Sequence, residues 1–531
     1  MSSHTTSPTV RITHGLLQGT TVLTAAGEVQ RYAGVPYAAA PLGDRRFRAP
    51  ARAAAWDGVR VATTFGPDPM QAMSGPFSGA VPGMAITAVD EDCLTLNVWT
   101  PAAAPDEQLP VMVWVAGGAF VVGGTSQPTY DAARLAAEQR VVVITVNYRV
   151  GCFGFLDLRE VPGGDTADTN CGLHDLALAL AWAGENAAAF GGDPDRITVF
   201  GESAGAGLIM HLLTTPGVGG LVRGAIAQSP GIDFTQRADT SAAVATALLA
   251  RVGVRTVREL RELPAVALLD AQTTVAADLL FDIGTMVFHP VVDDAFVTET
   301  PSVALAGGAA ADVALLLGYT TDELRLFLDP RPNRMDRAAL GGWVRSYLTA
   351  RMGRDPGHSV ADTLIGRYLD AASATTRSRG ADVWSALQTD ATMRQPVIRV
   401  ADSRDNRVAA TFVAQFGWQS QSADGVDRGA FHAIDLPFVF DTFDAGWAEF
   451  IGADDTARQL GRSIRAAWAA FAATRDPSCP ALGTWPRYNT VNRSTMVLDA
   501  VPSVVDDPLA EQRGWWAGLW HRSCRPAGVP R

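Results

Sequence analysis

The chain has 531 residues, of which 47% are hydrophobic and 18% are charged, and its formal net charge at pH 7 is −12. This composition is typical of a globular protein with a sizeable core, and the acidic balance argues against binding to bare nucleic acid. All 43 basic residues are arginine, so the chain lacks the lysine that a phosphate-binding P-loop, a pyridoxal Schiff base or a protein kinase requires.

The N-terminal sequence has no charged leader followed by an apolar run, and no later stretch approaches the roughly 18 apolar residues of a membrane span. We therefore expect a cytoplasmic protein that does not insert into a membrane. The five cysteines are scattered, without a C-x-x-C pair or a nearby pair of histidines. This pattern predicts free thiols and no metal site.

The region before residue 100 predicts short strands and turns, and the pattern then changes. Residues 111–118 and 141–149 are uninterrupted apolar runs rich in β-branched side chains, and residues 131–139 between them have helical composition. Continuous apolar strands on either side of a helix indicate a parallel sheet that is covered on both faces.

The same alternation continues along the chain. It predicts a helix over residues 172–189, a strand over 196–200, a helix that begins near Ala204, and later strands over 311–320 and 411–418. The repeated strand and helix pattern predicts a doubly wound α/β architecture, with residues 1–531 forming a single catalytic domain.

Two segments, residues 240–282 and 331–407, are helical in pattern and contain no strong strand. In an open α/β sheet such segments are commonly insertions over the carboxyl ends of the strands, where ligands bind. We therefore predict that they form a helical cap.

Residues 201–205 read Gly-Glu-Ser-Ala-Gly, which matches the G-x-S-x-G pattern of a nucleophilic serine. The match lies between a predicted strand and a predicted helix, as a nucleophile elbow requires, and the flanking glycines let the strand and the helix approach closely. The alternative is a glycine-flanked turn that contains an incidental serine. The context favours Ser203 as a nucleophile.

A serine hydroxyl needs a base that accepts its proton and an acid that orients the base. His432 is the best candidate base, because it lies in a turn-like sequence before an apolar run. Four other histidines follow the serine in the chain: His211, His289, His358 and His521. Glu323 and Asp322 both follow the predicted strand over 311–320, and the spacing leaves either one as the acid.

An oxyanion at the reacting carbonyl requires preorganised N–H donors. Residues 117–120, Gly-Gly-Ala-Phe, follow a predicted strand directly, and Ala204 follows the candidate nucleophile. Their amides could form an oxyanion hole. The alternative is a flexible glycine turn, which we would favour if Ser203 were absent.

Two long stretches of the chain resemble the signatures of the type-B carboxylesterases, the group that includes cholinesterases and bacterial carboxylesterases. Residues 190–205 resemble the family's serine signature over its whole length, and residues 91–99, Glu-Asp-Cys-Leu-Thr-Leu-Asn-Val-Trp, resemble its second signature. Weaker similarity extends from the region of Arg31 to Trp485. The resemblance therefore covers nearly the entire chain.

The resemblance implies an α/β-hydrolase fold with a triad of Ser203, Glu323 and His432, and it selects Glu323 over Asp322. It further implies oxyanion donors, buried polar neighbours of the triad and two scaffold ion pairs. The implied oxyanion donors are Gly118, Ala119 and Ala204, and the implied polar neighbours are Glu202 and Ser229. The implied ion pairs are Arg46 with Glu91 and Arg149 with Asp175.

The chain also departs from the family pattern. Ala116 replaces the His or Tyr that often precedes the paired glycines, and Asp68 stands where some members have a cysteine that forms a disulfide. Cys93 is therefore expected to be a free thiol. Leu324 follows the acid, where the family usually has a glycine. Pro230 replaces the residue that usually follows the serine at position 229.

The resulting expectation is a serine carboxylesterase that hydrolyses a small-molecule ester without a metal or an organic cofactor. The same triad acting on a carbamate, an amide or an aromatic polyester fragment is an alternative, and the loop over residues 70–84 with the helical segments would shape that choice. A non-catalytic binding module is a second alternative, since the fold supports such uses. The sequence does not indicate the oligomeric state.

Overall fold

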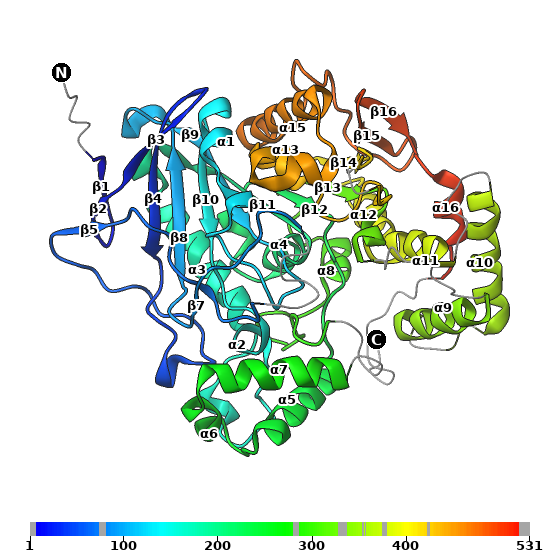
Figure 1. Ribbon diagram of the computed structural model, residues 1–531, viewed down its shortest axis with the longest axis horizontal. Helices are drawn as coiled ribbons and strands as arrows, with labels where there is room; N and C mark the ends of the chain where they lie inside the picture. The colour runs from blue at the N-terminus through cyan, green and yellow to red at the C-terminus, as the bar shows by residue number, and fades with distance from the viewer. Residues whose placement is uncertain are drawn as a thin grey trace.

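The structure, a computed structural model, describes residues 7–73, 81–279, 286–327, 337–352, 355, 357–373, 380–421 and 425–519. Its central feature is an eleven-stranded sheet with the strand order β16-β15-β14-β13-β12-β11-β9-β10-β8-β4-β3 (Figure 1). The seven consecutive strands from β15 to β10 are parallel to one another. These seven are β9 (Leu109–Val115), β10 (Val142–Val146), β11 (Gly192–Glu202), β12 (Gly224–Gln228), β13 (Ala314–Thr320), β14 (Thr411–Phe416) and β15 (Ser494–Leu498).

Antiparallel strands complete both edges of this sheet. They are β3 (Thr20–Thr24), β4 (Gly27–Pro36), β8 (Thr95–Thr100) and β16 (Ser503–Asp506). Two smaller sheets lie outside it. One contains β1 (Thr9–Ile12), β2 (Gly15–Gln18) and β5 (Val59–Val61), and the other contains β6 (Asp68–Pro69) and β7 (Val89–Asp90).

The parallel strands are buried on both faces, as their continuous apolar sequences predict. Alternate side chains of a strand point to opposite faces. In β9, Val111, Val113 and Val115 therefore enter one core, and Met112 and Trp114 enter the other. Each core needs a layer of helices to exclude water.

Helices supply both layers (Figure 1). The first core is covered by α3 (Cys171–Asn186), α4 (Ala204–Thr214) and α12 (Gln395–Ser403). The second is covered by α1 (Ala133–Gln139), α13 (Leu436–Phe440) and α15 (Asp455–Thr474). The shorter helices are α2 (Gly151–Phe155), α8 (Pro301–Gly307), α14 (Ala448–Ile451) and α16 (Ala510–Trp515). This arrangement confirms the predicted α/β class.

The predicted strands and helices are present with shifted ends. The strand predicted over 196–200 runs from Gly192 to Glu202, because it also includes residues 192–195 and the buried Gly201 and Glu202 that precede Ser203. The helix predicted over 172–189 ends at Asn186 and is followed by a 3₁₀ turn, Ala187–Phe190. The strand predicted over 411–418 ends at Phe416.

Most of the described residues of the two predicted cap segments are helical. The first contains α5 (Ala238–Val252), α6 (Val257–Glu262) and α7 (Ala265–Asp278). The second contains α9 (Arg337–Met352), α10 (His358–Ser373), α11 (Gly380–Thr389) and α12. Helix α12 packs on β13 and β14, so this end of the second segment belongs to the layer over the sheet. Helices α9 to α11 share a separate core with Trp515 and Trp516.

The two predicted scaffold ion pairs are formed. Asp175 accepts two hydrogen bonds from the guanidinium of Arg149, at 2.8 and 2.6 Å, and both side chains are buried. Arg46 pairs with Glu91 in the same bidentate way.

Within the described residues the thiols of Cys93, Cys152, Cys171 and Cys479 are buried and free, and Cys524 lies outside the described residues. No helix among the described residues has the length and apolar character to cross a membrane.

Replacing Asp175 with alanine should lower the free energy of unfolding by about 3–5 kcal/mol, because the Arg149 charge would remain buried without its partner. Denaturant unfolding measures this change. The matched control is Asp444→Ala, which removes the partner of the exposed Arg134 and should cost less than about 1 kcal/mol. Equal losses in the two variants would contradict the assignment of Arg149 and Asp175 to the buried scaffold.

Candidate active site

Ser203 lies at the sharp junction between β11 and α4. Its backbone has φ +57° and ψ −128°, a conformation that costs energy for a residue with a side chain. The junction is tight, since a Cβ at Gly205 would lie 2.1 Å from the carbonyl oxygen of Val115 and one at Gly201 would lie 2.7 Å from the same atom. Only glycine at both positions allows the serine to be presented in this way.

Three segments that are distant in sequence meet beside this serine. Ser203 follows β11, Glu323 follows β13, and His432 lies in the connection after β14. Because these strands are parallel, their carboxyl ends share one edge of the sheet. The parallel topology therefore places all three side chains together.

The three side chains form a continuous chain of hydrogen bonds. His432 Nε2 lies 2.7 Å from Ser203 Oγ, and His432 Nδ1 lies 2.6 Å from Glu323 Oε2. When the imidazole is neutral and donates its Nδ1–H to the Glu323 carboxylate, Nε2 is the acceptor for the serine hydroxyl proton. This is the arrangement in which a histidine can act as a base.

Glu323, rather than the adjacent Asp322, faces the histidine. The Asp322 carboxylate accepts hydrogen bonds from the Ala430 amide at 3.1 Å and from the Thr321 hydroxyl at 2.9 Å. It therefore fixes the backbone next to the histidine loop, while Glu323 contacts the imidazole itself.

Glu323 is fully buried, and other donors satisfy its second oxygen. Glu323 Oε1 accepts a hydrogen bond from Ser229 Oγ at 2.6 Å and one from the Thr320 amide at 2.7 Å. The predicted neighbour Ser229 thus contacts the acid directly. The His432 amide also donates to the Glu323 carbonyl at 3.1 Å, so both the side chains and the backbones of the two residues are joined.

The other predicted neighbour, Glu202, lies on the opposite side of the imidazole. Its Oε1 is 3.1 Å from His432 Nε2. Burial raises the pKa of Glu202 to about 8. Burial lowers the pKa of His432, but the charges of Glu202 and Glu323 outweigh this effect and raise it to about 9. The Glu202 carboxylate and the imidazolium stabilise each other, so they titrate as one coupled pair.

The predicted oxyanion donors lie on two turns with unusual backbones. Gly118 has φ +126° and Ala119 has φ +52°. The amides of Val121 and Val122 donate to the Gly118 carbonyl at 3.1 and 3.0 Å, which holds the turn closed. Ala204 is the first residue of α4, where an amide has no intrahelical acceptor. Within the described part of the chain, the amides of Gly118, Ala119 and Ala204 donate to no protein acceptor.

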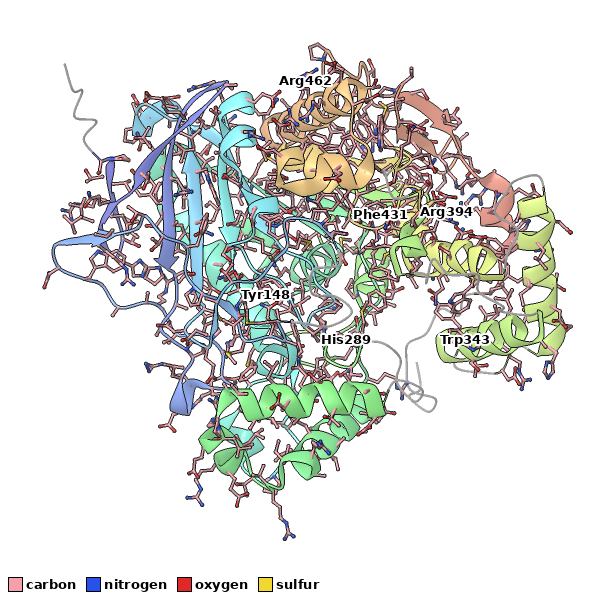
Figure 2. The ribbon with its side chains drawn as sticks, in the orientation of Figure 1. Tyr148, His289, Trp343, Arg394, Phe431 and Arg462 are labelled. Carbon is pink, nitrogen blue, oxygen red and sulfur yellow. The ribbon has the colours of Figure 1, made fainter. Side chains whose placement is uncertain are left out.

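The other candidate histidines that the structure describes have different surroundings from His432. His211 is buried in α4, where its ring nitrogens pair with the Gly207 carbonyl at 2.8 Å and the Thr235 hydroxyl at 2.9 Å. Burial lowers its pKa to about 4. His289, labelled in Figure 2, has its ring centroid 6.0 Å from that of Phe120. His358 lies on α10, and His521 lies outside the described residues.

Sequence analysis did not identify two further residues near the triad. Asp435 is buried one turn after His432, and its carboxylate accepts a hydrogen bond from Gln228 at 2.7 Å. Burial raises the pKa of Asp435 to about 6. Phe327 lies with its ring centroid 6.0 Å from that of His432 and is 43% exposed. Only their proximity in sequence to the triad residues could have indicated them.

Among the described residues, no group of three or more His, Cys, Asp or Glu side chains is placed to hold a metal ion. At the position of the disulfide found in some type-B carboxylesterases, the buried Asp68 accepts a hydrogen bond from the Ser126 hydroxyl at 2.7 Å.

Known proteins have this fold and align with nearly the whole length of the chain. The family model described as "Carboxylesterase family" matches residues 6–516. Para-nitrobenzyl esterase of Bacillus subtilis (strain 168) is 35% identical over 507 residues, covering 94% of this chain and 96% of that protein. Phenmedipham hydrolase of Pseudarthrobacter oxydans is 31% identical over 477 residues, covering 88% and 91%. The solved structure of a thermophilic PNB esterase aligns with a TM-score of 0.84 at 33% identity, covering 96% of this chain and 100% of that one.

The sheet topology and these similarities define an α/β-hydrolase fold. The chain belongs to the carboxylesterase family, and it is a carboxylic ester hydrolase.

The close packing at the elbow predicts opposite effects for two glycine substitutions within helices. Gly205→Ala should destabilise the protein by about 1–3 kcal/mol or more, because the new methyl group would overlap the backbone of β9. Gly184→Ala in α3, where the nearest atom to a new Cβ is 4.0 Å away, should stabilise it by about 0.5–1 kcal/mol. Thermal unfolding of both variants measures these effects, and a Gly205→Ala variant as stable as the wild type would contradict the tight junction.

Proposed function

We propose that the chain is a serine carboxylesterase in which Ser203 is the nucleophile, His432 the general base and Glu323 the orienting acid. The observation that carries the proposal is the unbroken series of short hydrogen bonds from the Ser203 hydroxyl through His432 to the buried Glu323 carboxylate. Membership of the carboxylesterase family supports ester hydrolysis as the reaction.

In the first step, His432 Nε2 accepts the Ser203 proton while Oγ attacks the ester carbonyl carbon. The Glu323 carboxylate stabilises the imidazolium that forms. The carbonyl oxygen becomes an oxyanion, and the amides of Gly118, Ala119 and Ala204 would donate hydrogen bonds to it. The tetrahedral intermediate then collapses, the C–O bond to the alcohol breaks, and the imidazolium gives its proton to the departing oxygen.

In the second step, water replaces the alcohol. His432 accepts a proton from the water as its oxygen attacks the acyl-enzyme carbonyl. Collapse of the second tetrahedral intermediate breaks the bond to Ser203 Oγ, and the imidazolium returns the proton to the serine. The products are a carboxylic acid and an alcohol, and the enzyme is regenerated.

The substrate is a small-molecule ester, and helices α5 to α7 and α9 to α11 are proposed to cap its binding site. Helix α11 supports this role because it contacts the 3₁₀ helix Glu323–Phe327, which carries the acid. The same triad would also serve for a carbamate, an amide or an aromatic polyester fragment. The values of kcat/KM for a matched ester, carbamate and anilide distinguish these substrate classes. A non-catalytic binding module has no support from the family match.

Replacing Ser203 with alanine should reduce ester turnover by a factor of about 10⁴ to 10⁶, since the nucleophile is lost while the fold is kept. Hydrolysis of a short-chain aryl ester measures the loss, and circular dichroism checks the fold. Ser463→Ala, at a buried serine of α15, is the matched control and should retain wild-type turnover. A fluorophosphonate probe should label the wild type and the control but not Ser203→Ala. Turnover that survives in Ser203→Ala would refute the assignment.

Replacing Glu202 with glutamine should move the acidic limb of the kcat/KM profile to lower pH. The base must be neutral, so activity falls as the pH drops through the pKa of His432, and an ionised Glu202 raises that pKa. Removing the charge lowers the pKa of His432, and the neutral imidazole then persists at lower pH. Glu185→Gln, at a carboxylate that pairs with Arg52, is the control and should leave the limb in place. An unchanged or upward-shifted limb in Glu202→Gln would contradict the coupling.

A further inference from the structure

Arg325 lies two residues after Glu323 on the same 3₁₀ helix, and its side chain is only 5% exposed. The hydrogen bonds of its guanidinium go to Asp382 and Asp427 and not to Ser203 or His432, and the sequence motifs do not include it. Its guanidinium nevertheless joins the acid-bearing segment to two other parts of the chain.

The first of these parts is the loop that leads to His432. Arg325 donates hydrogen bonds to the Asp427 carbonyl from Nη2 at 2.8 Å and from Nε at 3.2 Å, and Nη2 also lies 3.1 Å from Asp427 Oδ2. The same two segments are joined at two other places. The Asp322 amide donates to the Ala430 carbonyl at 3.0 Å, and the His432 amide donates to the Glu323 carbonyl at 3.1 Å. Arg325 therefore supplies the third connection between the segment of the acid and the segment of the base.

The second part is the helix α11. Arg325 Nη1 donates to Asp382 Oδ1 at 2.7 Å, and the Asp382 side chain is 2% exposed. Two residues further along α11, Trp384 belongs to the core that α9 to α11 share with Trp515 and Trp516. Asp382 thus belongs to the packed group of helices α9 to α11, and its bond to Arg325 connects this group to the 3₁₀ helix.

The chemistry of the arginine suits this role. A guanidinium has a planar set of donors in a fixed geometry, so it can bind three acceptors from two elements at once and restrict their relative positions. A 3₁₀ helix of five residues has few and poorly aligned internal hydrogen bonds. Its orientation, and with it the orientation of Glu323, depends on such external contacts.

We propose that Arg325 is a positioning residue that fixes Glu323 and His432 relative to each other and attaches both to α11. This inference rests on the proposed function of the triad. Arg325 touches neither the substrate nor the reacting atoms. The transfer of the serine proton requires the Ser203, His432 and Glu323 side chains to be aligned. Arg325 therefore affects this transfer more than it affects substrate binding.

The test compares Arg325→Lys with a matched variant of another buried arginine. Arg394 (Figure 2) pairs with Asp390 and is also buried, but its hydrogen bonds go to Asp390 and the Leu509 carbonyl and not to the 3₁₀ helix of Glu323. Lysine keeps the charge and loses the fixed set of donors in both cases. We expect Arg325→Lys to reduce kcat by about tenfold to a hundredfold, with KM within about twofold of the wild type, because small displacements of catalytic groups have effects of this size. Arg394→Lys should lower the melting temperature and keep kcat.

Asp382→Asn provides a second variant if Arg325→Lys does not fold, and it should reduce kcat in the same direction because the neutral amide holds Arg325 less firmly. The rate of labelling by a fluorophosphonate should fall in parallel with kcat. A folded Arg325→Lys with wild-type kcat, or with a loss no greater than that of Arg394→Lys, overturns the proposal. The same labelling experiment tests the proposed function separately. If the probe does not label the wild type, or if it labels Ser203→Ala, the proposed function is contradicted, whatever the result for Arg325→Lys.

Discussion

The site is organised around a negative charge with no exposed surface, the carboxylate of Glu323. A buried charge costs several kcal/mol unless hydrogen bonds and an opposite charge compensate it. Here the compensation comes from Ser229 after β12, from Thr320 at the end of β13 and from His432 after β14. The carboxyl ends of the three adjacent parallel strands β12, β13 and β14 must therefore lie side by side. The register of the sheet, which the burial of its apolar side chains fixes, places them so.

The Glu202 carboxylate lies on the opposite side of the imidazole, so the two glutamates have different surroundings. Glu323 receives direct hydrogen bonds from Ser229, Thr320 and the His432 imidazole. Glu202 has a buried oxygen near His432 Nε2, and its ionisation depends on that of the imidazole. One carboxylate thus orients the ring, and the other responds to its charge.

Much of this arrangement could be predicted from the sequence, because apolar runs and the Gly-Glu-Ser-Ala-Gly pattern are local signals. The strands around residues 111–118 and 311–320 and the elbow at Ser203 are of this kind. Asp322 and Glu323 are adjacent and chemically alike, so spacing could not separate them, and only the turn of the 3₁₀ helix shows which one faces His432. Asp435 and Arg325 act through tertiary contacts alone. Helix α12 has the same helical pattern as its neighbours, and the sequence does not show that it packs on the sheet.

The buried arginine–aspartate pairs have a further consequence because the cation in each of them is a guanidinium. Arg149, Arg325 and Arg394 each bind an aspartate in the interior. An ammonium in such pairs would begin to lose its proton near pH 10, whereas a guanidinium stays charged beyond pH 12. These pairs therefore keep their charges in moderately alkaline solution, where the His432 imidazole is neutral.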